Sequence, residues 1–202
     1  VSALFMVKLV DCLYAIEDNY NAPTHMMLYW GSWFNAATGP IFRGSRDLMT
    51  FGGVPKPILT AYELLAKLGE NRLAIEGPKA GNRYGLFATS DSTQIQLLAY
   101  NYNETDDDFE RLDDIELTID GLIGNNLKVT EYTLDRKHHN TYRAWKDMNS
   151  PEASPEVISQ LKKVAELTPN NEFAVSVTNG SIKLKSSILR HGMKLYVIDL
   201  NK

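Results

Sequence analysis

Residues 115–120 carry the most regular strand pattern of the sequence: Ile115-Glu116-Leu117-Thr118-Ile119-Asp120. Apolar and polar residues alternate with a period of two, which is typical of a strand that buries one face and exposes the other. Shorter segments of the same kind are separated by turn residues such as Asp91-Ser92 and Asn179-Gly180. Further strands are expected near residues 71–76, 83–90, 93–102, 127–134, 173–177, 181–185 and 193–200. Many short strands with tight turns predict an antiparallel β-sandwich.

The first 70 residues follow a helical period instead. Apolar residues at helical spacing predict one helix between Phe5 and Ile16, and a second helix that Pro57 opens and Gly69 closes as a C′ residue. Between them, the continuous apolar run at 26–30 is typical of a parallel strand buried on both faces. The stretch 31–55 is too long for a plain connector, and long loops after buried strands often carry functional sites.

This change of period divides the chain. Residues 1–70 are predicted to be α/β and residues 71–202 mostly β, with a domain boundary near residue 70. One helix is expected within the β region, because Ser154 is a good N-cap and Pro155 suits the first helical position. We expect that helix to pack at the side of the sandwich. The sequence starts at Val1 inside a helical pattern, so we also expect a fragment of a longer chain.

The composition excludes several kinds of partner. The 202 residues include 21 Lys+Arg and 25 Asp+Glu, for a formal net charge of -4. No basic footprint for nucleic acid or an anionic membrane surface is present, and no apolar run approaches the roughly 20 residues that span a bilayer. Cys12 is the only cysteine, so neither an intrachain disulfide nor a Cys-based zinc site can form. We expect no cofactor, nucleic-acid or membrane partner, and the compartment stays undetermined.

Four large aromatic residues cluster around the end of the predicted strand at 26–30: Tyr29, Trp30, Trp33 and Phe34. Barrels and doubly wound sheets place ligand sites there, and aromatic faces stack on the C–H groups of sugar rings. The same cluster would serve equally well as packing under a loop. Both roles stay open.

Two polar clusters suggest metal sites, but their spacing disfavours them. Adjacent residues of a strand point to opposite faces, and His138-His139 has no third ligand at a suitable spacing, so a loop contact or a capping role is favoured. The aspartates at 106–108 and 113–114 lack the spaced oxygen ligands and the glycine of a calcium loop. A solvated turn is predicted there, and no metal site.

Three longer stretches resemble one known family. Residues 52–69 read GGVPKPILTAYELLAKLG, residues 138–151 read HHNTYRAWKDMNSP, and residues 189–192 read LRHG. They are similar to the barrel-closing segment, the loop ahead of a late helix and the final strand of glycoside hydrolase family 39, which contains β-xylosidases and α-L-iduronidases. The three stretches follow one another in the family's order across nearly the whole chain, so the resemblance is more specific than any single motif.

This resemblance implies a fold: the last α-β-α portion of a (β/α)8 TIM barrel over residues 1–70, then an antiparallel β-sandwich accessory domain over residues 71–202. It also implies that a full-length parent hydrolyses a carbohydrate substrate by a retaining, β-xylosidase-like mechanism, which uses a pair of carboxylates. Both family glutamates are expected upstream of Val1. Glu17, Asp18, Asp47 and Glu63 in the α/β segment form no convincing catalytic set. No catalytic residue is therefore assigned.

The predicted substrate-binding residues are Tyr29, Trp30, Trp33 and Arg43. By the resemblance, Tyr29-Trp30 matches a Tyr-Trp pair on the eighth barrel strand, where the Trp borders the sugar subsite. The sequence then departs from the family's xylosidases, which have polar and acidic residues after this pair and a His-Gly pair where Arg43-Gly44 stands. An arginine would favour an acidic sugar or substituent, although an exposed loop arginine is the other interpretation.

Two functions from different classes remain. The first is the C-terminal region of a family-39-like hydrolase, and the alternative is a non-catalytic carbohydrate-binding or structural module of a degenerate family member. In either case the strand at 26–30 needs neighbours for its backbone groups. We expect a second copy of the chain, giving a homo-oligomer, or a chain with the upstream barrel strands to provide them.

Overall fold

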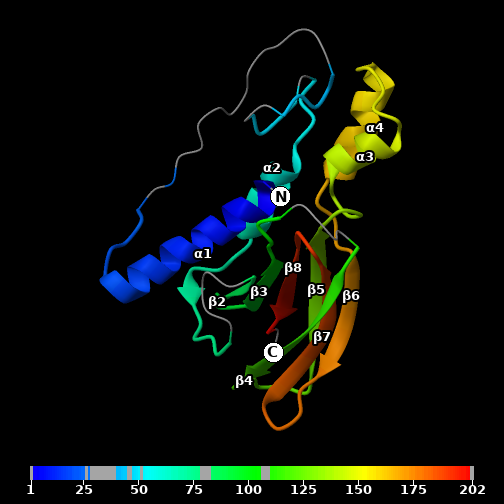
Figure 1. The fold of residues 1–202 in the computed structure, drawn as a ribbon. Helices are drawn as coiled ribbons and strands as arrows, with labels where there is room; N and C mark the ends of the chain where they lie inside the picture. The colour runs from blue at the N-terminus through cyan, green and yellow to red at the C-terminus, as the bar shows by residue number, and fades with distance from the viewer. Residues whose placement is uncertain are drawn as a thin grey trace.

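The computed structural model describes residues 2–25, 27, 40–44, 47–50, 52–77, 83–105 and 110–200. Within these residues, two helices come first, then eight strands with a helical pair between the fifth and sixth (Figure 1). The elements are α1 (Ser2–Tyr20), α2 (Pro57–Leu65), β1 (Asn71–Arg72), β2 (Tyr84–Ser90), β3 (Gln94–Asn101), β4 (Leu112–Asp120), β5 (Asn126–Leu134), α3 (Thr141–Asp147), α4 (Pro155–Ala165), β6 (Asn171–Ser176), β7 (Ser181–Leu189) and β8 (Gly192–Asp199).

The strands form two sheets. The larger has the order β1-β2-β3-β8-β5-β6 and the smaller consists of β4 and β7, and the strand pairs are antiparallel. In β4, Ile119 is buried, Ile115 and Leu117 are half-buried, and Glu116 between them is exposed. The predicted antiparallel sandwich and its most regular strand are therefore confirmed. The strand expected at 71–76 is shorter than predicted, since only Asn71–Arg72 pair with β2.

The larger sheet has a core on each face. On β8, Met193 and Leu195 pack with the core that includes α1 and α2, whereas Tyr196 and Ile198 pack with β4 and β7. Alternation along one strand therefore separates a helix-facing core from a core between the sheets. The result is three layers: two helices, six strands and two strands.

Gly69 plays a different role from the predicted one. The helix α2 ends at Leu65 with Ala66 as its C-cap, and Gly69 lies beyond it, without a left-handed backbone. A Cβ on Gly69 would lie 2.7 Å from the backbone carbon of Ser90, and the Gly69 N–H donates to Thr89 Oγ1 at 2.9 Å. The glycine thus permits close approach to the sheet rather than terminating the helix.

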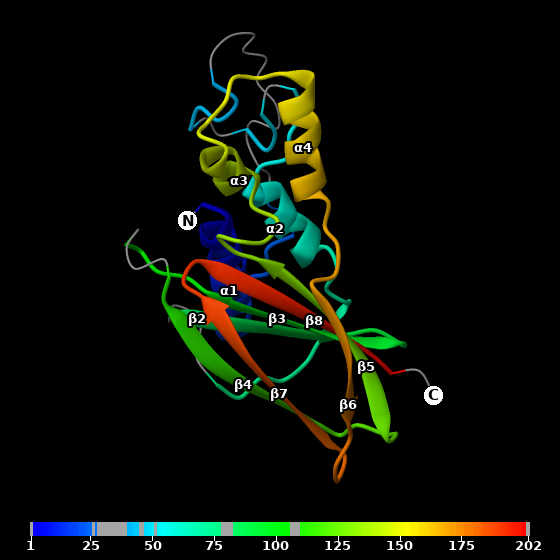
Figure 2. The same ribbon diagram turned by 90° about the vertical axis from the view of Figure 1, so that its right-hand side faces the viewer.

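The helical pair between β5 and β6 differs from the prediction in two ways. The helix α3 is additional to the single predicted helix, and Asn140 caps it by accepting a hydrogen bond from the Arg143 backbone N–H at 3.0 Å. The predicted α4 is present, with Ser154 Oγ accepting from Val157 N–H at 3.2 Å. However, α3 and α4 project from one end of the sandwich in both ribbon views, and α4 packs against α3 instead of the side of the sandwich (Figures 1 and 2).

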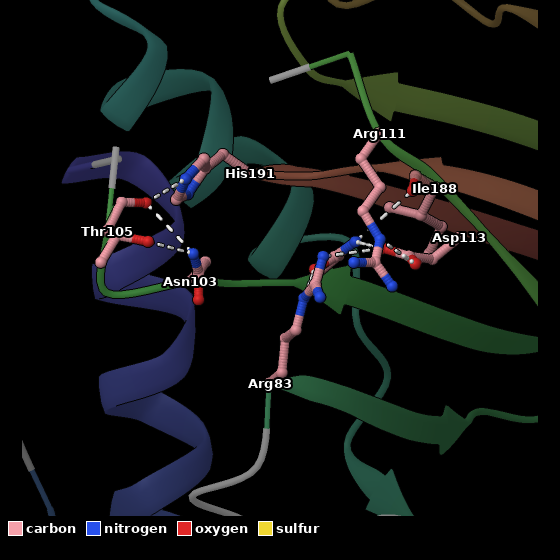
Figure 3. A network of polar contacts seen from close by, with 8 residues as sticks. Arg83, Asn103, Thr105, Arg111, Asp113, Ile188 and His191 are labelled. Atoms are coloured by element: carbon pink, nitrogen blue, oxygen red, sulfur yellow. Dashed lines mark hydrogen bonds and ion pairs between the residues drawn. The ribbon is translucent and has the colours of Figure 1, made fainter. Parts of the chain in front are cut away.

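A polar network joins the two sheets (Figure 3). The Asp113 carboxylate on β4 accepts hydrogen bonds from Arg83 Nη2 at 2.8 Å, Asn101 Nδ2 at 2.8 Å and Arg111 Nε at 3.0 Å. Burial alone would raise the pKa of Asp113, but these hydrogen bonds and the charge of Arg83 outweigh it and lower the pKa. The solvated turn predicted at 113–114 is wrong, because both residues belong to β4.

Some predictions concern residues that lie outside the described ranges. Of the strand predicted at 26–30, only Met27 is among the described residues, and it has no assigned secondary structure there. The aspartates at 106–108 lie outside the described residues too. Within the described part of the chain, no helix combines the length and apolar character of a membrane span.

Candidate functional site

The four predicted substrate-binding residues lie in or near the long loop ahead of α2. Tyr29, Trp30 and Trp33 fall outside the described residues. Arg43 is exposed, and its Nε donates a hydrogen bond to the Pro40 backbone carbonyl at 3.2 Å. The structure thus places Arg43 at the surface, and sugar binding by the four residues stays a prediction.

The described residues of the later part of this loop, 40–44, 47–50 and 52–56, contribute apolar side chains that pack onto α3 and α4. These side chains and those of the two helices make a third core, separate from those of the sandwich. Five buried residues form it: Ile41, Phe42, Val54, Trp145 and Leu161. The Phe42 and Trp145 rings lie 5.4 Å apart between centroids. Burial of these large side chains stabilises the loop against the helices by an apolar contact.

Hydrogen bonds shape the loop and attach it to α3. The Thr50 N–H donates to the Val54 carbonyl at 2.9 Å, which closes a tight turn. Gly52 in this turn has φ +86°, a conformation that favours glycine. Thr141, at the start of α3, donates from Oγ1 to the Pro55 carbonyl at 2.6 Å. An insertion in the sandwich therefore holds the end of the loop that carries Arg43 and that follows Tyr29, Trp30 and Trp33 in the sequence.

The histidine pair lies just before α3 and makes local contacts. His138 Nδ1 is 3.0 Å from Asp135 Oδ1. His139 is buried, with Nδ1 2.7 Å from the Thr133 carbonyl and Nε2 accepting from the Thr168 N–H at 3.3 Å. The predicted loop contact is confirmed. Among the described residues, no group of three or more His, Cys, Asp or Glu is placed to hold a metal ion.

A buried carboxylate and a half-buried lysine lie within the loop. Asp47 is only 6% exposed. Burial lowers the pKa of Lys56, and the negative charge of Asp47 partly opposes this effect. The Lys56 backbone N–H also donates to the Leu48 carbonyl at 2.9 Å. Asp47 therefore lies in the loop interior rather than on its surface.

A second candidate is a cavity of about 830 Å³ between α1, β2 and residues 72–77. Its carboxylates have partners. Tyr100 donates to Asp11 Oδ2 at 2.5 Å, and Arg72 Nη2 donates to Asp18 Oδ1 at 2.5 Å. Burial raises the pKa of Asp11, although the hydrogen bond from Tyr100 opposes this, and burial and Asp11 together raise the pKa of Tyr100. Both contacts attach α1 to the sheet region, so we assign them a structural role.

The residues that support the loop were absent from the predicted site. Phe42, Tyr142 and Trp145 come from distant segments, and their ring centroids lie 5.4 to 6.1 Å apart. The signal in the sequence is the pair of aromatic residues, Tyr142 and Trp145, within the stretch 138–151 that carries the family resemblance.

Comparison with protein families gives one match over most of the chain. The model of the glycosyl hydrolases family 39 matches residues 12–182. Among curated proteins, a β-xylosidase of Caldicellulosiruptor saccharolyticus is 28% identical over 153 residues, which are 75% of this chain and 31% of that protein.

Solved structures agree in fold. The family 39 enzyme of Xanthomonas axonopodis pv. citri aligns with a TM-score of 0.67 at 16% identity, over 79% of this chain and 33% of its own. A monomeric β-xylosidase of Caulobacter crescentus CB15 aligns with a TM-score of 0.65 at 20% identity, over 79% of this chain and 34% of its own. The chain thus spans about a third of the length of these relatives.

Proposed function

The chain belongs to the glycosyl hydrolases family 39, and we propose that it forms the C-terminal part of a retaining, β-xylosidase-like enzyme. The match over residues 12–182 is the observation that carries this proposal. The relatives are about three times as long, which supports a role as one part of a larger enzyme. In the full-length parent, the substrate would be a carbohydrate.

In this proposal, residues 1–70 complete a (β/α)8 barrel and residues 71–202 form its accessory β-sandwich. The surface of α1 supports it. Phe5, Ile16 and Tyr20 are 51%, 43% and 78% exposed, although their positions follow the apolar spacing of a buried helix. A barrel portion contributed by the upstream sequence would cover these side chains.

The proposed chemistry divides between the upstream sequence and this chain. A retaining glycosidase uses one carboxyl group as acid/base and a second as nucleophile, and we place both upstream. Tyr29, Trp30 and Trp33 would border the sugar through their rings, with Arg43 nearby to donate hydrogen bonds. The core formed by the loop with α3 and α4 supports this role, because a sugar site needs its binding loop held in one conformation.

Hydrolysis of nitrophenyl glycosides tests the proposal. We expect no nitrophenol release from an aryl β-xyloside or uronide by this chain alone, and release once it is joined to its upstream sequence. In that longer protein, Trp30→Ala should lower kcat/KM by roughly tenfold or more, since it removes a stacking ring. Ile123→Ala is the matched control, because Ile123 is 85% exposed in the sandwich.

Two results would contradict the proposal. Nitrophenol release by the chain alone would place the catalytic groups within it. A longer protein that folds but cleaves neither glycoside would favour the non-catalytic alternative, a carbohydrate-binding or structural module.

A further inference from the structure

Tyr142 is a large aromatic residue left at the surface of α3. It is 46% exposed, whereas Trp145 on the same helix is 5% exposed and Phe42 is 8% exposed. Its neighbours in the sequence have clear internal roles. Asn140 caps α3, Thr141 donates to the loop, and the Trp145 indole N–H donates to the Pro151 carbonyl at 2.9 Å. Packing explains these residues more completely than it explains Tyr142.

The Tyr142 ring is nevertheless held in place by two buried aromatic rings. It meets Phe42 edge-on, with ring centroids 5.5 Å apart and planes at 76°, and its centroid lies 6.1 Å from that of Trp145. Both supporting rings belong to the buried core between the loop and the helices. A ring that is already ordered loses little conformational entropy when a ligand stacks on it.

Cationic side chains lie over the ring and on the adjoining loop. The Lys146 ammonium lies over the Tyr142 ring, 5.9 Å from its centroid, and over the Trp145 ring, 5.0 Å from its centroid. Arg43, next to Phe42 in the sequence, is exposed on the same loop. A sugar ring offers C–H groups to an aromatic face and hydroxyl groups to cationic donors at its edge, so this combination fits a saccharide better than a purely apolar ligand.

We propose that Tyr142 is a stacking residue for a second sugar of an oligosaccharide substrate, so that α3 extends the binding site beyond the sugar that is cleaved. This inference rests on the proposed function for its substrate class. It assigns the sandwich insertion a direct role in substrate binding, in addition to its support of the loop.

Binding of xylotriose to the 202-residue chain tests this directly, with xylose as the single-sugar comparison. Titration followed by NMR chemical shifts needs no catalysis. Tyr142→Phe keeps the ring and should bind within about twofold of wild type, whereas Tyr142→Ala and Tyr142→Leu should bind about tenfold more weakly. Tyr142→Leu keeps an apolar side chain against Phe42, so it still tests the inference in the case that Tyr142→Ala disturbs α3. Tyr20→Ala is the matched control, because Tyr20 is 78% exposed on α1.

Three results would overturn the inference: no binding of xylotriose by the wild-type chain, unchanged binding by the alanine and leucine variants, or equal weakening by Tyr20→Ala. The two proposals fail separately. A longer protein that cleaves xylosides while this chain shows no Tyr142-dependent binding would refute this inference alone. Tyr142-dependent binding without any hydrolysis by the longer protein would refute the catalytic proposal alone.

Discussion

Replacement of Asp113 by alanine should destabilise the sandwich strongly for a single polar side chain. Asp113 and its partner Arg83 have 13% and 24% of their side-chain surface exposed, and Asn101, which also donates to this carboxylate, is fully buried. Asp113→Ala removes the acceptor and leaves these donors in a poorly solvated place. An unsatisfied buried group costs about 1–3 kcal/mol, so we expect a loss of roughly 2–3 kcal/mol after allowing for partial exposure.

Urea unfolding at pH 7 measures this loss, with Asp114→Ala as the control. Asp114 is the next residue of β4, is exposed, and accepts a hydrogen bond from Ser187 Oγ at 2.6 Å. Its loss should cost under about 1 kcal/mol. Because the pKa of Asp113 is lowered in the folded state, its stabilising effect is present above the unfolded pKa of about 4 and disappears as the pH falls through the folded pKa. An Asp113 variant within about 0.5 kcal/mol of wild type, or equal to the Asp114 variant, would refute the network's role.

Local pattern was sufficient for most of the described strands and for three of the four described helices, α1, α2 and α4. The two-residue alternation from Ile115 to Ile119 predicted a half-buried strand because it reflects the geometry of a single strand on a single core. The Ser154 cap was equally local, since its hydroxyl bonds to the N–H of Val157. Such local patterns do not predict the order of the strands in the sheet. The last strand, β8, lies between β3 and β5, and such pairings depend on contacts between distant segments.

The short helix α3 shows why the candidate site was harder to predict. It spans only Thr141–Asp147, too short to be stable by propensity or to show a clear apolar face. Its stability depends on Trp145, which packs against the distant Phe42. The sequence places aromatic residues in both segments, but nothing local indicates that they meet. The role of α3 in holding the loop therefore follows from the tertiary structure alone.

Two further predictions concern the loop and the α1 contact. Trp145→Phe should weaken hydrogen-exchange protection at the Thr50 amide and leave the protection of the Val129 amide in β5 unchanged. The substitution shrinks the ring that anchors the loop and removes the hydrogen bond from the indole to the Pro151 carbonyl. Equal loss of protection at both amides would mean a global effect instead. Asp11→Asn should raise stability at pH 7 relative to wild type, by an amount that shrinks toward pH 3. Since burial raises the folded pKa of Asp11, the folded state binds its proton more tightly than the unfolded chain, and wild-type stability falls as the pH rises through the unfolded and then the folded pKa. The neutral amide has no charge to desolvate, so urea unfolding at pH 7 and pH 3 should show the difference in the free energy of unfolding between variant and wild type. If the variant's stability relative to wild type is lower at pH 7 than at pH 3, the buried-carboxylate argument is wrong.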